Sequence, residues 1–72
     1  MAREIREAIE QGPIAAEICD LHVWRVGKGQ YACIVSVLTS AQAEPEDFKQ
    51  LLRVHEELVH ISVEINRAGS AA

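Results

Sequence analysis

The side chains that could do chemistry in this 72-residue chain are those that bind divalent metal ions. They include two cysteines and three histidines, namely Cys19, Cys33, His22, His55 and His60. Thiolate, imidazole and carboxylate are the ligands that zinc prefers, and imidazole also suits cobalt and nickel. No CxxC or HxxxH pair occurs, so local spacing does not define a site. Any metal site must therefore be assembled from separate strands or separate subunits.

The end of the chain predicts a strand over residues 60–67. Its apolar positions alternate with polar ones, which places His60 and Glu64 on the same face. Four residues span about 13 Å along a strand, too far for these two side chains to share one ion unaided. If they bind metal, we expect His60 and Glu64 to bind separate ions or the strand to be bent. The alternative is that this is an ordinary solvated strand face.

An earlier strand is predicted over residues 16–26. Strict alternation puts Cys19 on one face, with Leu21 and Val23, and puts His22 and Trp24 on the other. Cys19 and His22 can then bind one ion only if a bulge intervenes. His22 has an alternative role in packing or hydrogen bonding beside Trp24. The glycines of the following turn, 27–29, allow a tight hairpin.

The second strand of that hairpin is predicted over residues 30–39. Both of its faces are largely apolar, which indicates a central strand covered on both sides. We expect Cys33 on the outer face of the sheet, where it could bind metal; the alternative is a small buried residue.

Two helices complete the pattern. One is predicted over 2–11, with a left-handed cap at Gly12, and the other from Pro45 to about Leu58, with His55 at the edge of the core. The order helix, strand, strand, helix, strand predicts a ferredoxin-like α+β sandwich with a three-stranded mixed sheet, the last strand parallel to the second. We expect one domain over 1–67 and a disordered tail over 68–72.

The sheet face away from the helices is too apolar to leave in water, so a second subunit is expected to cover it. Trp24, Tyr31 and Val35 are the residues predicted at this dimer interface, and the alternative for the two aromatic residues is ordinary packing on the sheet.

Composition excludes several classes of protein. The net charge is −4 and no run of Lys or Arg exceeds one residue, which argues against nucleic-acid binding. No apolar stretch approaches the 18 residues of a membrane span. Two cysteines without a signal peptide favour a reducing compartment.

A short string carries a resemblance to a known family. The run Asp20-Leu21-His22-Val23-Trp24 resembles the start of the cytosolic domain of cation diffusion facilitators, and residues 59–65 resemble its final strand. The resemblance covers roughly residues 3–67 and is nearest to the bacterial cobalt/nickel/zinc efflux branch. It implies a homodimer on the cytoplasmic side of the inner membrane, attached to six membrane helices. It also implies a divalent ion, zinc or else cobalt, nickel or cadmium.

The same resemblance suggests ligand positions. Family members often carry ligands at positions that resemble His60, Glu64 and Asn66, and Cys33 matches a position that carries a ligand in some relatives. Cys19 matches a position often held by histidine. Val35 stands where several relatives have histidine, so the family's interface site is incomplete here.

Other classes of protein match these residues less well. A stand-alone metal carrier of similar fold is the main alternative, although such carriers usually have a CxxC. An acylphosphatase-like hydrolase needs an anion-binding loop with catalytic Arg and Asn, which Gly27-Lys28-Gly29 does not supply. No catalytic arrangement is evident, so we do not expect an enzyme.

Overall fold

Five elements follow one another in a computed structural model that describes residues 1–67; the predicted disordered tail, 68–72, lies outside the described residues. Their bounds are α1 (Ala2–Glu10), β1 (Glu17–Gly27), β2 (Gln30–Thr39), α2 (Pro45–Leu52) and β3 (Leu58–Arg67). The protein is a ferredoxin-like α+β sandwich, as the order of the elements predicted. Within residues 1–67, no helix has the length and apolar character needed to cross a bilayer.

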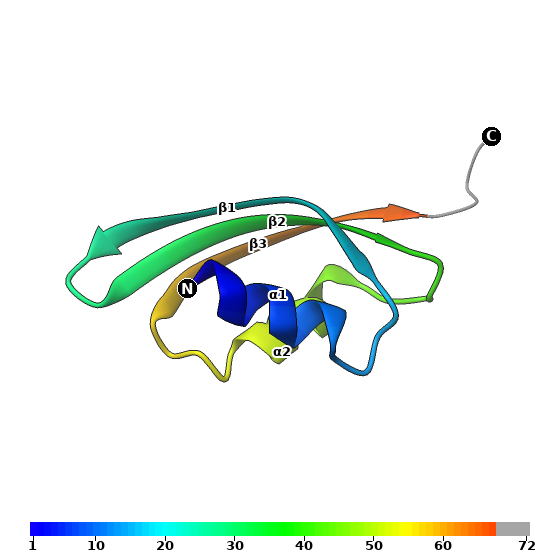
Figure 1. Cartoon of the computed structure of the whole chain (residues 1–72), viewed down its shortest axis with the longest axis horizontal. Coiled ribbons are helices and arrows are strands. Elements are labelled where there is room, and N and C mark those ends of the chain that lie inside the picture. The colour runs from blue at the N-terminus through cyan, green and yellow to red at the C-terminus, as the bar shows by residue number, and fades with distance from the viewer. Residues whose placement is uncertain (68–72) are drawn as a thin grey trace.

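The three strands form one mixed sheet in the order β1-β2-β3. β1 runs antiparallel to β2, and β3 runs parallel to β2, so the prediction of a central second strand is confirmed. Both helices lie on the same side of the sheet, while the other side carries no helix (Figure 1). The β1–β2 hairpin extends past the helix layer at one end.

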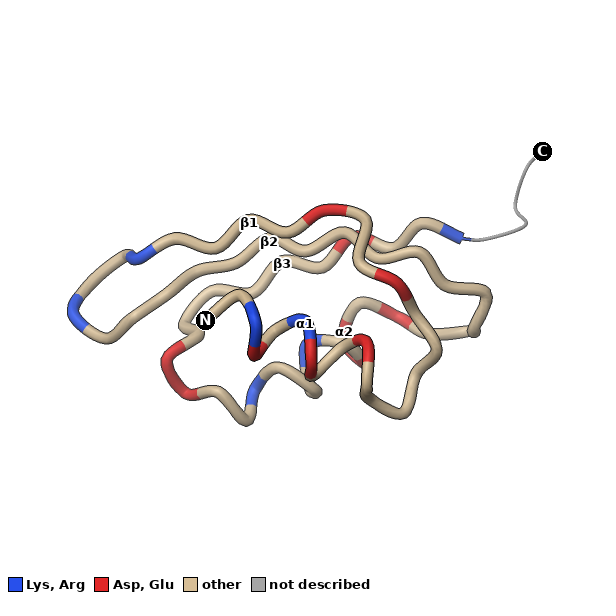
Figure 2. Tube along the Cα trace, in the orientation of Figure 1, with Lys and Arg blue, Asp and Glu red and all other residues tan. Residues whose placement is uncertain are grey.

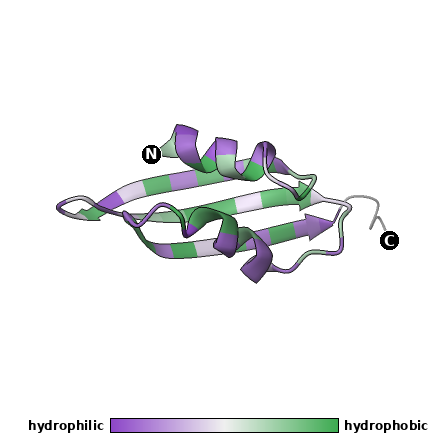
Figure 3. Ribbon diagram, turned by 90° about the horizontal axis from the view of Figure 1, so that it is seen from below, coloured by the Kyte–Doolittle hydropathy of each residue, from purple (hydrophilic) through white to green (hydrophobic). Residues whose placement is uncertain are grey.

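The core lies between the helices and the sheet. Helix α1 contributes Ile5 and Ile9, and α2 contributes Phe48 and Leu52, all fully buried. These positions recur at helical spacing, which lets each short helix turn one apolar stripe towards the sheet. Seen from below, the two helices lie in front of the three-stranded sheet, and each helix carries both apolar and polar residues (Figure 3). The opposing residues of β2 are also buried, namely Cys33, Val35 and Val37.

The second helix is shorter than predicted. It ends at Leu52, and β3 already begins at Leu58. The backbone N–H of Tyr31 donates to the carbonyl of Glu57 at 2.7 Å, which draws the chain onto the edge of β2 at this point. Leu58 is buried opposite Tyr31. Leu58 thus belongs to the sheet, although its apolar spacing also suited the predicted helix.

Gly12 does not adopt the left-handed conformation predicted for it. Among the described residues only Gly29, in the hairpin turn, has a positive φ, of 67°. A Cβ atom at Gly12 would lie 2.5 Å from the carbonyl oxygen of Ala8 and 3.3 Å from Leu51 Cδ1. Glycine is therefore needed here because the chain passes close to α1 and α2, and not for its dihedral freedom.

A β-bulge interrupts β1. The pairing with β2 shifts between Ile18 and Asp20, so Cys19 is the extra residue. The N–H of Ile18 donates to Oε2 of Glu10, at the end of α1, over 3.3 Å. This bond supplies a partner for an amide beside the irregularity, and it lets Ile18 pack against the core.

Candidate functional site

The candidate functional site is the sheet face that no helix covers, called the open face below, because it carries histidines, carboxylates and exposed apolar side chains. Its residues alternate along the strands with those that pack on the helices. It consists of Asp20, His22 and Trp24 of β1, Ala32, Ile34, Ser36 and Leu38 of β2, and His60, Ser62, Glu64 and Asn66 of β3.

The strand register arranges this face in cross-strand rows. The rows, from the hairpin end onward, are Trp24–Ala32–His60, His22–Ile34–Ser62, Asp20–Ser36–Glu64 and Leu38–Asn66. The face is therefore ordered along its length. An aromatic and an imidazole lie in the row nearest the hairpin, and two carboxylates lie in the third row.

The open face carries large apolar side chains that are exposed. Trp24 is 45% exposed and Ile34 is 46% exposed. Ala32 is only 1% exposed, although no helix covers this side, because its larger neighbours in the row shield it. Large exposed apolar side chains side by side on a sheet are typical of an interaction surface.

One histidine of the open face is already oriented by a carboxylate. Nε2 of His22 lies 2.9 Å from Oδ2 of Asp20, two residues away on the same strand. Both side chains are about two-thirds exposed, at 65% and 64%. The other ring nitrogen, Nδ1, is left for a ligand, and a carboxylate partner of this kind fixes the orientation of a metal-binding imidazole.

The carboxylate of Glu64 is held across two strands. Ser36 Oγ donates to Glu64 Oε1 at 3.3 Å, and Asn66 Nδ2 donates to Ser36 Oγ at 2.7 Å. This short chain of hydrogen bonds fixes where the carboxylate lies while leaving it exposed. Ser36 and Asp20 were not among the predicted site residues. The signal for Ser36 was a polar residue in the middle of an otherwise apolar strand.

The predicted placement of His60 and Glu64 on one face of β3 is confirmed. They lie four residues apart, with Ser62 between them. Within residues 1–67 of a single copy, no three His, Cys, Asp or Glu side chains gather closely enough to hold a metal ion. One copy therefore offers the donor atoms of the open face as separated groups and pairs.

Cys33 does not lie on the outer face, so that prediction is wrong. It is 1% exposed and belongs to the core beneath the helices, and burial raises the pKa of its thiol. A metal ligand must be a thiolate, which this surrounding opposes. Val35 is fully buried and Tyr31 packs against the same core, so neither lies on the open face; of the predicted interface residues, only Trp24 does.

Cys19 is exposed, on the bulge of β1. Strict alternation predicted that it shares a face with Leu21 and Val23, but the bulge gives the core-facing position to Ile18 instead. A bulge between Cys19 and His22 was the condition under which the two side chains could bind one ion, and the bulge is present. Even so, Cys19, His22 and Asp20 do not form a group that could hold a metal ion.

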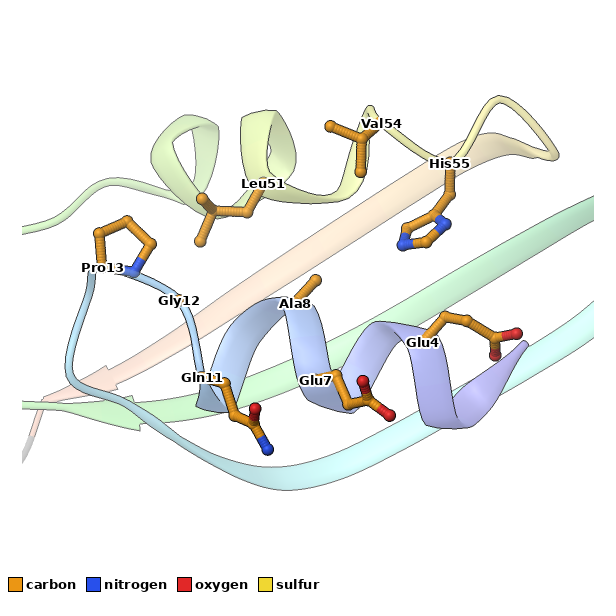
Figure 4. A pocket seen from close by; sticks show the side chains of 9 residues that line it. All are labelled: Glu4, Glu7, Ala8, Gln11, Gly12, Pro13, Leu51, Val54 and His55. Atoms are coloured by element: carbon orange, nitrogen blue, oxygen red, sulfur yellow. The ribbon is translucent and has the colours of Figure 1, made fainter.

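A separate hollow of about 440 Å³ lies between the two helices. It is lined by Glu4, Glu7, Ala8, Gln11, Gly12, Pro13, Leu51, Val54 and His55 (Figure 4). Glu4 and His55 face each other across one end, and His55 is half-buried there. Both carboxylates form ion pairs with nearby groups. Glu7 Oε1 lies 3.8 Å from Arg3 Nε, and Glu4 Oε1 lies 3.2 Å from the terminal ammonium nitrogen. Each acidic group of this hollow thus has a basic neighbour.

Comparison of the sequence with family profiles and with curated proteins gave no match.

Proposed function

We propose that this chain is the cytosolic metal-sensing and dimerisation domain of a divalent-cation efflux transporter of the cation diffusion facilitator type. The observation that carries the proposal is the composition of the open face, which combines exposed apolar side chains with imidazoles and carboxylates. The string Asp20–Trp24, which carries the family resemblance, contributes three of the residues on that face.

The apolar part of the open face supports pairing with a second copy. A domain of this size buries only about 60% of the surface that its unfolded chain exposes, so covering Trp24 and Ile34 adds a substantial share to its stability. Polar side chains on the two outer strands flank Ile34 of β2, and most interfaces likewise have polar residues around their apolar part. Homodimers with two-fold symmetry are the commonest way to cover such a surface.

The polar part supports metal binding. His22, His60, Asp20 and Glu64 supply nitrogen and oxygen donors, which suit zinc, cobalt and nickel, with cadmium as a further candidate. Because one copy offers only separated groups, a multidentate site takes ligands from both copies. Metal then binds one arrangement of the two copies better than another, and it shifts the equilibrium by that difference in affinity.

In a transporter, such a shift would be transmitted to the membrane portion to which the two domains are joined. Metal on the cytoplasmic side would thereby regulate its own export. The role is regulatory, and transport itself belongs to the membrane portion.

A zinc titration of the purified chain by calorimetry, with mass followed by light scattering, tests the proposal. We expect a dimer that binds Zn²⁺, with His60→Ala weakening binding at least tenfold, which is about 1.4 kcal/mol. Ser62→Ala is the matched control, because Ser62 lies on the same face between His60 and Glu64 and offers no strong ligand.

Two results would contradict the proposal. A dimer without measurable Zn²⁺ binding would leave a domain that only pairs subunits. A monomer that binds Zn²⁺ would favour the stand-alone carrier instead.

A further inference from the structure

We propose that the tip of the β1–β2 hairpin, residues 25–29, binds the surface of an anionic lipid membrane. The inference goes beyond the proposed function, because it requires neither a metal ion nor a second copy of the chain. It follows from three features of the hairpin tip, which are its charge, the exposed apolar side chain within it and its place at one end of the molecule.

The hairpin tip is basic, although the chain as a whole is acidic. It carries Arg25 and Lys28, and the sequence has no Asp or Glu between Asp20 and Glu44. The whole chain has 11 acidic residues and a net charge of −4. Figure 2 shows the two cations of the tip without an acidic residue beside them on the hairpin. A local positive charge of this kind attracts a surface of negatively charged lipid headgroups.

An apolar side chain is exposed within the hairpin tip. The pairing of β1 with β2 shifts between Arg25 and Gly27, so Val26 is the extra residue of a second bulge. Val26 is 46% exposed. Arg25 Nε donates to the carbonyl of Gly27 at 3.2 Å, a bond that spans the bulge. An apolar side chain among cations suits the boundary between lipid headgroups and acyl chains.

The hairpin tip projects from one end of the molecule. The molecule is 43 Å long, and the tip lies at one end of this long axis, past the helices and past the loop that carries Glu56 and Glu57 (Figure 1). A Cβ atom at Gly29 would meet no other atom within 4 Å. Stable protein complexes bury at least about 1,200 Å² in total, which is more than this narrow tip offers. A fluid membrane, by contrast, adapts to a projecting tip.

The carboxylates of the chain do not prevent this contact. Charges are screened over about 8 Å at physiological ionic strength. Asp20 lies five residues from Arg25 on β1, which is about 16 Å at the usual rise of a strand. When the molecule meets a membrane tip first, Asp20 is therefore about twice the screening distance behind the cations. This orientation suits the proposed function, in which the domain is joined to a membrane portion.

Vesicle binding by the 72-residue chain tests the inference. Vesicles of phosphatidylcholine with about 30% phosphatidylglycerol should bind the chain at low salt. Vesicles of phosphatidylcholine alone should bind it about 25-fold more weakly, because each of two basic residues near an anionic surface contributes about fivefold. Raising NaCl to about 0.5 M should weaken the binding to anionic vesicles, because salt screens the attraction.

Two pairs of substitutions test which cations make the contact. Arg25→Gln with Lys28→Gln should weaken binding to the anionic vesicles about 25-fold. Arg6→Gln with Lys49→Gln is the matched control, because it makes the same change of charge on the two helices, and it should cost less than about twofold. Since Arg25 also spans the bulge, Lys28→Gln alone is a further variant. It leaves that bond in place and should cost about fivefold.

The only tryptophan of the chain locates the contact. Trp24 lies two residues from Val26, so lipids with a nitroxide on the headgroup should quench its fluorescence when the chain binds. Val26→Ser should weaken binding about threefold, because the exposed 46% of valine is the part that a membrane would cover.

Failure of the wild type to bind anionic vesicles would overturn the inference. Equal losses in the two double variants, or vesicle binding without quenching of Trp24, would overturn it as well, because another surface would then make the contact. Zn²⁺ binding and dimerisation are measured without lipid, so these results are distinct from a failure of the proposed function.

Discussion

Replacing Ile34 by threonine isolates the apolar contribution of the open face to dimerisation. Threonine keeps the branched Cβ atom that suits a strand, so the fold of the single copy should persist. Ile34 is 46% exposed in the single copy, and this exposed part is what a partner would cover.

The magnitude follows from that exposure. Fully burying an isoleucine side chain is worth about 1.5–3 kcal/mol, so the remaining 46% corresponds to about 0.7–1.4 kcal/mol per copy. A dimer contains the residue twice, which gives about 1.4–2.8 kcal/mol, or a ten- to hundredfold change in Kd. Because threonine retains one methyl group, we expect the lower end, about tenfold.

Sedimentation equilibrium over a range of concentrations measures the dimer Kd, and urea unfolding of dilute protein checks the stability of the single copy. Val54→Thr is the control, because Val54 is 75% exposed but lies on the helix side of the molecule. An unchanged Kd for Ile34→Thr, or an equal loss for Val54→Thr, would refute the assignment of the open face as the interface.

Two further predictions concern the core and its edges. Burial raises the pKa of Cys33 above its ordinary value of 9.0, so its contribution to the free energy of unfolding is constant below about pH 9 and falls as the pH rises further. Cys33→Ala should flatten that fall in urea unfolding at pH 8–10, and an equal flattening by Cys19→Ala, at an exposed position, would contradict this origin. Gly12→Ala should lower the free energy of unfolding by about 1–3 kcal/mol, since its Cβ would lie 2.5 Å from the Ala8 carbonyl oxygen. In thermal unfolding, Gln11→Ala at the adjacent exposed position should change the free energy by under about 0.5 kcal/mol, and equal effects would exclude the steric cause.

Local signals were sufficient where a segment had one clear periodicity. In β3, Ile61, Val63 and Ile65 pack against the core and His60 and Glu64 face away, as the alternation predicted. The start of α2 at Pro45 was also predicted, because proline fits the first turn of a helix.

Prediction failed where two structures competed for the same residues. The segment after Leu52 has apolar spacing that suits a helix, but Leu58 pairs beside Tyr31 in the sheet and is buried there. The bulge at Cys19 has no distinctive residue type. It depends on the register between β1 and β2 and on the bond from Ile18 to Glu10, which joins residues of different elements.

In the candidate site, too, local spacing predicted some features and contacts between elements decided others. The sequence supplied the ligand types and placed His60 and Glu64 on one face of one strand. It could not place Cys33, because both faces of β2 are apolar and alternation alone does not say which of them the helices cover.

By itself, the sequence determined the order of the elements, the buried stripes of the helices and the central position of β2, because these depend on spacing along the chain. Only the tertiary structure decided which side of the sheet stays open and which residues share a row across it. The physical reason is that a row is a relation between strands. It is set by the hairpin register and the parallel pairing of β3, and the short-range pattern within any one strand does not contain it.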